Sequence, residues 1–250
     1  MRVWCWRAAV LLAALLLWEG AARMLNLNPI LYVGPSRLPS ALGRVLATRD
    51  LPPLSGHVWL TLGEIAAAYA LAVAGGLWVG FLLGLRKTLG RIYEPLLAAL
   101  SAVPSVVWYP SLMLFLGLGP ASKIAFGVLL GFFPVTLSVL AGIRQVPDTL
   151  LAVAVSMGAG RWTLFRKVML PAMASTMVGG LRSGLALSVV GVLVGELLGA
   201  RAGLGYVINY AYGLMMTAEY AALVVLVAAA VLLLDGVGSV IEGRVRRWSA

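Results

Sequence analysis

The sequence predicts an all-helical, polytopic membrane protein with six transmembrane helices. Hydrophobic residues make up 62% of the 250 residues and charged residues only 11%, whereas soluble domains carry about 25% charged residues. The mean hydropathy of the chain is +0.99. Several apolar segments have the roughly 20 residues that a helix needs to cross the hydrocarbon core. We therefore expect the lipid bilayer to surround most of the chain.

The first predicted span lies within residues 1–25, where a charged start precedes the apolar run Ala8–Trp18. A charged start and a short apolar core also fit a cleaved signal peptide. However, Glu19 and Arg23 stand where the small neutral residues of a cleavage site belong. We therefore expect this span to stay uncleaved.

Residues 26–57 are richer in proline, asparagine and arginine, so we expect an external loop with a short amphipathic helix around Pro39–Thr48. The first predicted unit, residues 1–56, is thus a span with its loop. Residues 57–247 form the second unit, which contains five further spans. These lie at about 59–85, 95–117, 123–143, 173–199 and 219–241.

Small residues and prolines distinguish three of these spans. Glycine and alanine are frequent in 59–85 and 173–199, and they allow helix backbones to approach closely, so these spans are predicted to pack against other helices. The span at 95–117 contains Pro104 and Pro110, each of which removes a backbone hydrogen bond. A broken helix is tolerated at membrane depth where it lines a cavity or is buried in protein.

The distribution of lysine and arginine predicts the orientation of the chain. Twelve basic residues fall at the two chain ends, in the loop at 86–91 and in the stretch 144–171, against six on the opposite side. Cytoplasmic loops collect basic residues, so we expect both termini and residues 144–171 inside the cell. The same rule explains the net charge of +10 without a nucleic-acid partner.

The stretch Arg144–Pro171 differs from the apolar sequence around it. Pro147–Asp148 predicts a helix start with Asp148 as a side-chain cap, and the glycines at 158 and 160 predict a break. Apolar residues at 150, 151, 153 and 155 lie before the break. A second short helix, with Trp162, Phe165 and Met169 on one face, is predicted to end at Leu170–Pro171. Two short helices between two spans indicate a docking element.

Sequence signatures of catalysis are missing. The chain has no phosphate-binding Gly-x-x-x-x-Gly-Lys-Ser/Thr loop and no His-Glu-x-x-His or Gly-x-Ser-x-Gly motif. One cysteine and one histidine exclude a disulfide within the chain and a cysteine-based zinc site. We therefore expect neither an enzyme nor a metal site in this chain.

Charged residues inside the predicted spans are candidates for function, because a charge in the bilayer costs a few kcal/mol or more. Arg182 and Glu196 lie fourteen residues apart in one span, about 21 Å along the axis, and so cannot pair with each other. Glu64 is expected near the membrane interface and Asp235 near water. Candidates for a solute pathway are Ser101, Trp108, Tyr109, Arg182 and Glu196.

The stretch at 144–171 resembles the cytoplasmic loop of permease subunits of binding-protein-dependent ABC importers. That loop follows the pattern Glu-Ala-Ala-x3-Gly-x9-Ile-x-Leu-Pro. Here Gly158 and Leu170–Pro171 match, Val168 takes the isoleucine position, and Ala152–Val153–Ala154 replace the opening triplet, so the glutamate is missing. The resemblance extends over about residues 57–247. Within the family, the chain is similar to the branch that serves nitrate, aliphatic sulfonates and taurine. Segments that carry it include Pro104–Pro110, Leu116–Gly119, Phe132–Pro134, Gly180–Arg182, Gly195–Gly199 and Gly203–Tyr206.

The resemblance implies a type I ABC importer permease of a bacterial inner membrane that forms the pathway for a small, anionic solute. It implies a homodimer, two ATPase subunits inside that bind the ATP, an extracytoplasmic substrate-binding protein outside, and no cofactor in this chain. The residues it assigns to ATPase coupling are Asp148, Leu151, Ala152, Val153, Ala154, Val155, Gly158, Arg161, Val168, Leu170 and Pro171. A secondary transporter or channel, which more often shows inverted repeats, and an intramembrane enzyme are the alternative hypotheses.

Overall fold

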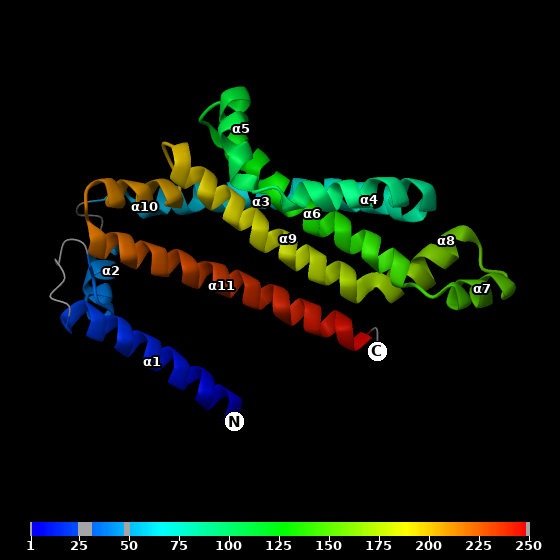
Figure 1. The fold of residues 1–250 in the computed structure, drawn as a ribbon, viewed down its shortest axis with the longest axis horizontal. Helices are drawn as coiled ribbons and strands as arrows, with labels where there is room; N and C mark the ends of the chain where they lie inside the picture. The colour runs from blue at the N-terminus through cyan, green and yellow to red at the C-terminus, as the bar shows by residue number, and fades with distance from the viewer. Residues whose placement is uncertain (1, 25–31, 48–50, 249–250) are drawn as a thin grey trace.

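The computed structural model describes residues 2–24, 32–47 and 51–248, and within them all regular structure is helical (Figure 1). The α-helices are α1 (Arg2–Met24), α2 (Leu38–Leu46), α3 (Leu54–Leu85), α4 (Lys87–Ala102), α5 (Tyr109–Leu116), α6 (Pro120–Gln145), α7 (Asp148–Ser156), α8 (Arg161–Leu164), α9 (Leu170–Gly199), α10 (Leu204–Gly213) and α11 (Thr217–Trp248). Helix α2 confirms the short helix predicted in the loop after α1; Thr48 lies outside the described residues.

Four of the described helices, counting α8 and α9 together, are long and apolar enough to cross a membrane. A fifth span results if α4 and the segment 105–116 are taken as one. Helix α1 occupies the first predicted span but is not among these candidates. The all-helical membrane fold is therefore confirmed, and the count of six spans stays a prediction.

The third predicted span is broken. Helix α4 ends at Ala102, a 3-10 turn covers Ser105–Trp108, and the two parts meet at 86°. Pro104 precedes the turn, as expected for a residue that has no N–H to donate. Pro110, in contrast, lies in the first turn of α5, where a proline costs no helical hydrogen bond. The predicted break is confirmed, and Pro104 marks its position.

Helices α3, α6 and α9 form the centre of the bundle through small residues. A side chain at Gly80 of α3 would come within 2.7 Å of Val139 of α6. A side chain at Gly191 of α9 would come within 2.7 Å of the Gly127 backbone of α6. Only glycine permits these approaches, so the predicted helix packing of the two glycine-rich spans is confirmed.

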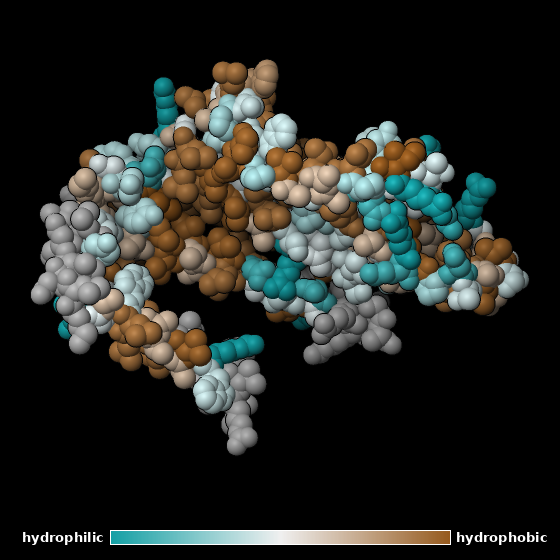
Figure 2. Space-filling view, in the orientation of Figure 1, coloured by the Kyte–Doolittle hydropathy of each residue, from teal (hydrophilic) through white to brown (hydrophobic). Residues whose placement is uncertain are grey.

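Helices α7 and α8 lie together at one end of the molecule, and α2 and α10 lie at the opposite end (Figure 1). The end with α7 also holds the junction of α3 and α4 and the C-terminal end of α6. Most of the loop cations that were predicted to share one side therefore meet at this end. Figure 2 shows hydrophilic side chains gathered there, with hydrophobic ones over the middle of the molecule.

Candidate functional site: an exposed loop helix and a buried polar cluster

Helix α7 ends in a hydrogen-bonded turn that requires a glycine. The Gly158 N–H donates to the Val155 carbonyl (2.9 Å), and the Ala159 N–H donates to the Ala154 carbonyl (3.0 Å). This is the Schellman pattern, in which the residue after the helix cap takes a left-handed conformation. Gly158 has φ +82°. The break that the sequence predicts at this glycine is therefore confirmed.

The start of α7 differs from the prediction in one respect. The helix begins at Asp148, as expected, but Pro147 occupies the cap position and no side chain caps the helix. The prediction that the Asp148 side chain caps α7 is therefore wrong. As an acid in the first turn, Asp148 still interacts favourably with the positive end of the helix dipole.

The apolar residues of α7 differ in exposure. Leu150, Val153 and Val155 are 44 to 57% exposed, and Met157 in the following turn is 82% exposed. Leu151 is half-buried and lines a cavity against the ends of α3, α4 and α6. The exposed set is therefore available to a partner, whereas Leu151 fixes α7 to its own chain.

The second short helix does not end at Leu170–Pro171. Helix α8, a π-helical turn at Phe165–Met169 and α9 form one continuous helix of 39 residues, Arg161–Gly199. Pro171 lies in the first turn of α9, and the π turn at this point accommodates a residue that cannot donate a backbone hydrogen bond. The predicted boundary at Leu170–Pro171 is therefore wrong.

The remaining residues assigned to the loop lie on the same two segments. Ala152, at the position of the missing glutamate, is exposed, and Ala154 is half-buried. Arg161 and Pro171 are exposed, whereas Val168 and Leu170 are half-buried. Phe165 stacks on Trp162 (6.0 Å between ring centroids) and meets Phe81 of α3 edge-on, so aromatic contacts join α8 to the bundle.

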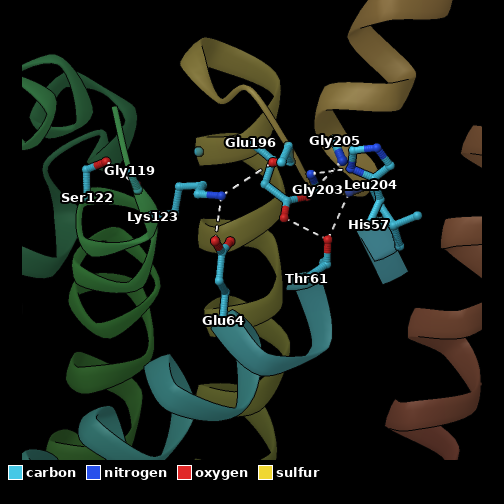
Figure 3. Close-up of polar contacts among 12 residues, drawn as sticks. His57, Thr61, Glu64, Gly119, Ser122, Lys123, Glu196, Gly203, Leu204 and Gly205 are labelled. Atoms are coloured by element: carbon cyan, nitrogen blue, oxygen red, sulfur yellow. Dashed lines mark hydrogen bonds and ion pairs between the residues drawn. The ribbon is translucent and has the colours of Figure 1, made fainter. Parts of the chain in front are cut away.

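A buried ion pair lies at the opposite end of the bundle (Figure 3). Lys123 at the start of α6 and Glu64 on α3 are each 3% exposed, and Lys123 Nζ lies 2.5 Å from Glu64 Oε1. Within the described residues, the Glu64 carboxylate is paired with the Lys123 ammonium group. Each residue buries its charge against the other, a pairing that was not predicted from the sequence; the expectation that Glu64 lies near the membrane interface stays a prediction.

A second buried carboxylate organises the turn that follows α9. Glu196 accepts hydrogen bonds from the Thr61 hydroxyl (2.7 Å) and from the Gly205 N–H (2.8 Å). Thr61 accepts in turn from the Leu204 N–H (2.9 Å), so α10 starts on side chains from α3 and α9 (Figure 3). A side chain at Gly203 (φ +116°) would lie 2.0 Å from the Glu196 carboxylate, which explains the glycine.

His57 completes this arrangement. Its Nδ1 accepts from the Gly203 N–H at 2.9 Å, and its ring lies 5.8 Å from that of Tyr206. The cluster of His57, Thr61, Glu64, Lys123 and Glu196 thus joins α3, α6 and α9 to the start of α10. Neither Thr61 nor His57 was predicted from the sequence to belong to a site. A polar residue three positions before Glu64, on the same helix face, was the available signal.

The pathway candidates lie in different surroundings. Tyr109 is 1% exposed, and its hydroxyl donates to the Gly195 carbonyl (2.7 Å). Trp108 is 46% exposed and lines an apolar hollow of about 390 Å³ with Phe115 and Phe133. Ser101, near the end of α4, is exposed and donates to its own helix. A pathway role stays a prediction for all three residues.

Arg182 is paired across helices. Its guanidinium bonds Asp235 of α11 through two nitrogens (2.7 and 2.6 Å) and Glu242 through the third (2.9 Å). The Asp235 side chain is still 39% exposed, so its expected position near water is compatible with this pairing, which was not predicted from the sequence. The three charges join α9 to α11, and they lie well away from Glu196, as the spacing along α9 predicts.

The comparisons with known proteins agree with this architecture. A family model described as "Binding-protein-dependent transport system inner membrane component" matches residues 72–247. The riboflavin transport system permease protein RibX of Chloroflexus aurantiacus is 35% identical over 164 residues, which cover 66% of this chain and 61% of RibX. The taurine transport system permease protein TauC of Escherichia coli is 28% identical over 240 residues, which cover 95% of this chain and 87% of TauC.

A solved structure shows the same fold. One chain of an inward-facing structure of the MetNI methionine ABC transporter superposes on this chain with a TM-score of 0.64, at 24% identity. The match covers 77% of this chain and 95% of the other. The expected permease fold and the likeness to the taurine-type branch are confirmed. The chain belongs to the inner-membrane components of binding-protein-dependent transport systems, the permease subunits of ABC importers.

Proposed function

We propose that α7 is the segment through which a separate ATPase subunit acts on this permease, and that two copies of the chain enclose the solute pathway. In this proposal the ATPase binds the ATP, the permease holds no cofactor, and α7 and both termini lie in the cytoplasm. The proposal is supported by four exposed apolar side chains, here called the exposed apolar set: Leu150, Val153, Val155 and Met157. These side chains stand at the basic end of the molecule on a helix fixed by the Gly158 turn.

The position of the missing glutamate fits an apolar docking surface. Ala152 is exposed beside Val153, so a partner meets small and apolar side chains here and no carboxylate. Burial of apolar surface contributes about 25 cal/mol per Å². Docking at α7 therefore depends on shape and apolar area.

The solute is inferred from the relatives. We infer a small solute that carries a negatively charged group, delivered by an extracytoplasmic binding protein, because taurine carries a sulfonate and the taurine permease TauC aligns over 95% of this chain. RibX, whose name assigns it to riboflavin transport, aligns over a shorter segment. The two named solutes differ greatly in size, and taurine alone carries charged groups, so uptake assays have to include both chemical classes.

Copurification of ATPase activity tests the docking role of α7. A tagged chain is purified from membranes of its own host as wild type, as Val155→Asp and as the conservative control Val155→Ile. We expect Val155→Asp to retain at least about tenfold less ATPase, because a charge buried in an apolar contact costs about 1.4 kcal/mol or more. The control is expected to behave as wild type.

Leu151→Asp separates docking from stability. Leu151 is half-buried against its own chain, so this substitution is expected to lower the thermal stability of the permease itself. Equal ATPase retention by wild type and Val155→Asp would refute the docking role. Solute uptake by the reconstituted chain alone, without ATP, would favour a secondary transporter or channel.

A further inference from the structure

A cavity of about 420 Å³ lies on the inner side of α7. The end of α3, the start of α4 and the end of α6 form its other walls. Apolar side chains cover much of the lining, among them Leu83, Ile143, Leu151 and Met169. The spans α3 and α6 both end at this cavity, and in the orientation proposed above their ends face the headgroups of the cytoplasmic leaflet.

Three cations and one carboxylate line the polar part of the cavity. Lys87 and Arg91 come from the first turns of α4, Arg144 from the end of α6, and Asp148 from the start of α7. Arg144 is neutralised by an ion pair with Glu94. Lys87 and Arg91 form no ion pair with any residue in the part of the chain that the structure describes. Two exposed cations one turn apart therefore stand at the mouth of an apolar hollow.

The start of α4 adds to this positive potential. Helix α4 begins at Lys87, and no side chain caps its first N–H groups. A helix N-terminus carries about half a positive charge and binds phosphate through free N–H groups. The cavity thus combines two unpaired cations, a helix start and an apolar wall, which together match a ligand with an anionic phosphate and a hydrocarbon chain.

We propose that this cavity binds the headgroup of an anionic phospholipid. The phosphate lies between Lys87 and Arg91 at the start of α4, and an acyl chain covers Leu83 and Ile143 toward the membrane. Basic pockets between membrane helices on the cytoplasmic side are a recurring site for anionic headgroups. Because Leu151 of α7 lines the same cavity, the bound lipid contacts the helix that carries the exposed apolar set.

Native mass spectrometry of the purified full-length chain tests this assignment. Delipidated protein in detergent is titrated with phosphatidylglycerol, with phosphatidylcholine and with inorganic phosphate. We expect wild type to retain phosphatidylglycerol in preference to phosphatidylcholine. The double variant Lys87→Gln/Arg91→Gln is expected to bind phosphatidylglycerol roughly thirtyfold more weakly, from a loss of about fivefold per juxtamembrane cation.

The double variant Arg166→Gln/Lys167→Gln is the matched control. It removes the same charge from exposed positions at the same end of the molecule, outside the cavity, and is expected to bind as wild type. Equal weakening in both double variants would show a general charge effect and overturn the site. Equal retention of the two lipids would overturn the headgroup assignment, and displacement of phosphatidylglycerol by millimolar phosphate would indicate a free-anion site instead.

Discussion

The turn at Gly158 allows a quantitative test of the coupling role of α7. Gly158 has φ +82°, and a side chain added there would find nothing within 4 Å. The substitution Gly158→Val therefore introduces no clash, and its whole cost comes from the backbone conformation. For an L-residue the left-handed region costs about 1–2 kcal/mol, with β-branched residues at the upper end.

That cost predicts the size of the effect. If the docking conformation of α7 requires this turn, a penalty of about 1–2 kcal/mol lowers the equilibrium constant for forming it roughly five- to thirtyfold. Apparent affinity for the ATPase is reduced by up to the same factor, because the partner binds only the competent fraction. Gly158→Asn is expected to lose less, because asparagine tolerates the left-handed region better than valine.

Gly160 provides the matched control two residues away. It also has nothing within 4 Å of an added side chain, but its φ is −67°, which any residue adopts. ATPase retained by the tagged chain is measured across a range of ATPase concentrations for wild type, Gly158→Val, Gly158→Asn and Gly160→Val. We expect Gly160→Val to bind the ATPase as tightly as wild type, Gly158→Asn to bind it more weakly, and Gly158→Val to bind it most weakly. An unchanged affinity for Gly158→Val, or an equal loss for Gly160→Val, would refute the reasoning.

Two further predictions concern the buried cluster. Lys123→Met leaves the Glu64 carboxylate without its counter-charge and is expected to destabilise the chain by about 3–5 kcal/mol, as a lower melting temperature in detergent. The double variant Lys123→Met/Glu64→Gln should recover most of the loss, and a single variant that melts as wild type would contradict the pairing. Glu196→Ala removes the acceptor of the Gly205 N–H and the Thr61 hydroxyl, so we expect faster tryptic cleavage at the exposed Arg201 in the adjoining turn. Cleavage at the wild-type rate would show that Glu196 does not hold this turn.

The elements of the fold follow from local sequence, because each depends on a length or a residue type. Apolar runs of sufficient length predicted α3, α6, α9 and α11, and Pro104 predicted the break after α4. The loop helix α7 was bounded by Pro147 and Gly158, whose backbone constraints act without regard to the rest of the chain. These predictions needed no knowledge of which helices touch.

The partners of the charged residues could not be predicted, because they depend on contacts between distant segments. Lys123 follows a glycine-rich turn and resembles a loop cation until α6 is placed beside Glu64 of α3. Leu151 and Val155 are equally apolar in the sequence, and only the packed ends of α3, α4 and α6 separate the half-buried residue from the exposed one. The boundary at Pro171 failed for a local reason, since the π turn at Phe165–Met169 lets one helix continue through a residue that cannot donate a backbone hydrogen bond.

The continuity of α8 and α9 relates the two ends of the molecule. One helix of 39 residues, about 58 Å long at 1.5 Å per residue, begins beside the Gly158 turn and ends three residues after Glu196. Its far part is fixed to α3 through Thr61, to α5 through the Tyr109 hydroxyl on the Gly195 carbonyl, and to α10 through the Gly205 N–H. A rigid helix fixed in this way cannot shift at one end and stay in place at the other. A displacement of α8 by a docked partner must therefore either bend the helix at the π turn Phe165–Met169 or move the buried cluster with it, and the substitutions at Gly158 and Glu196 act on opposite ends of that one helix.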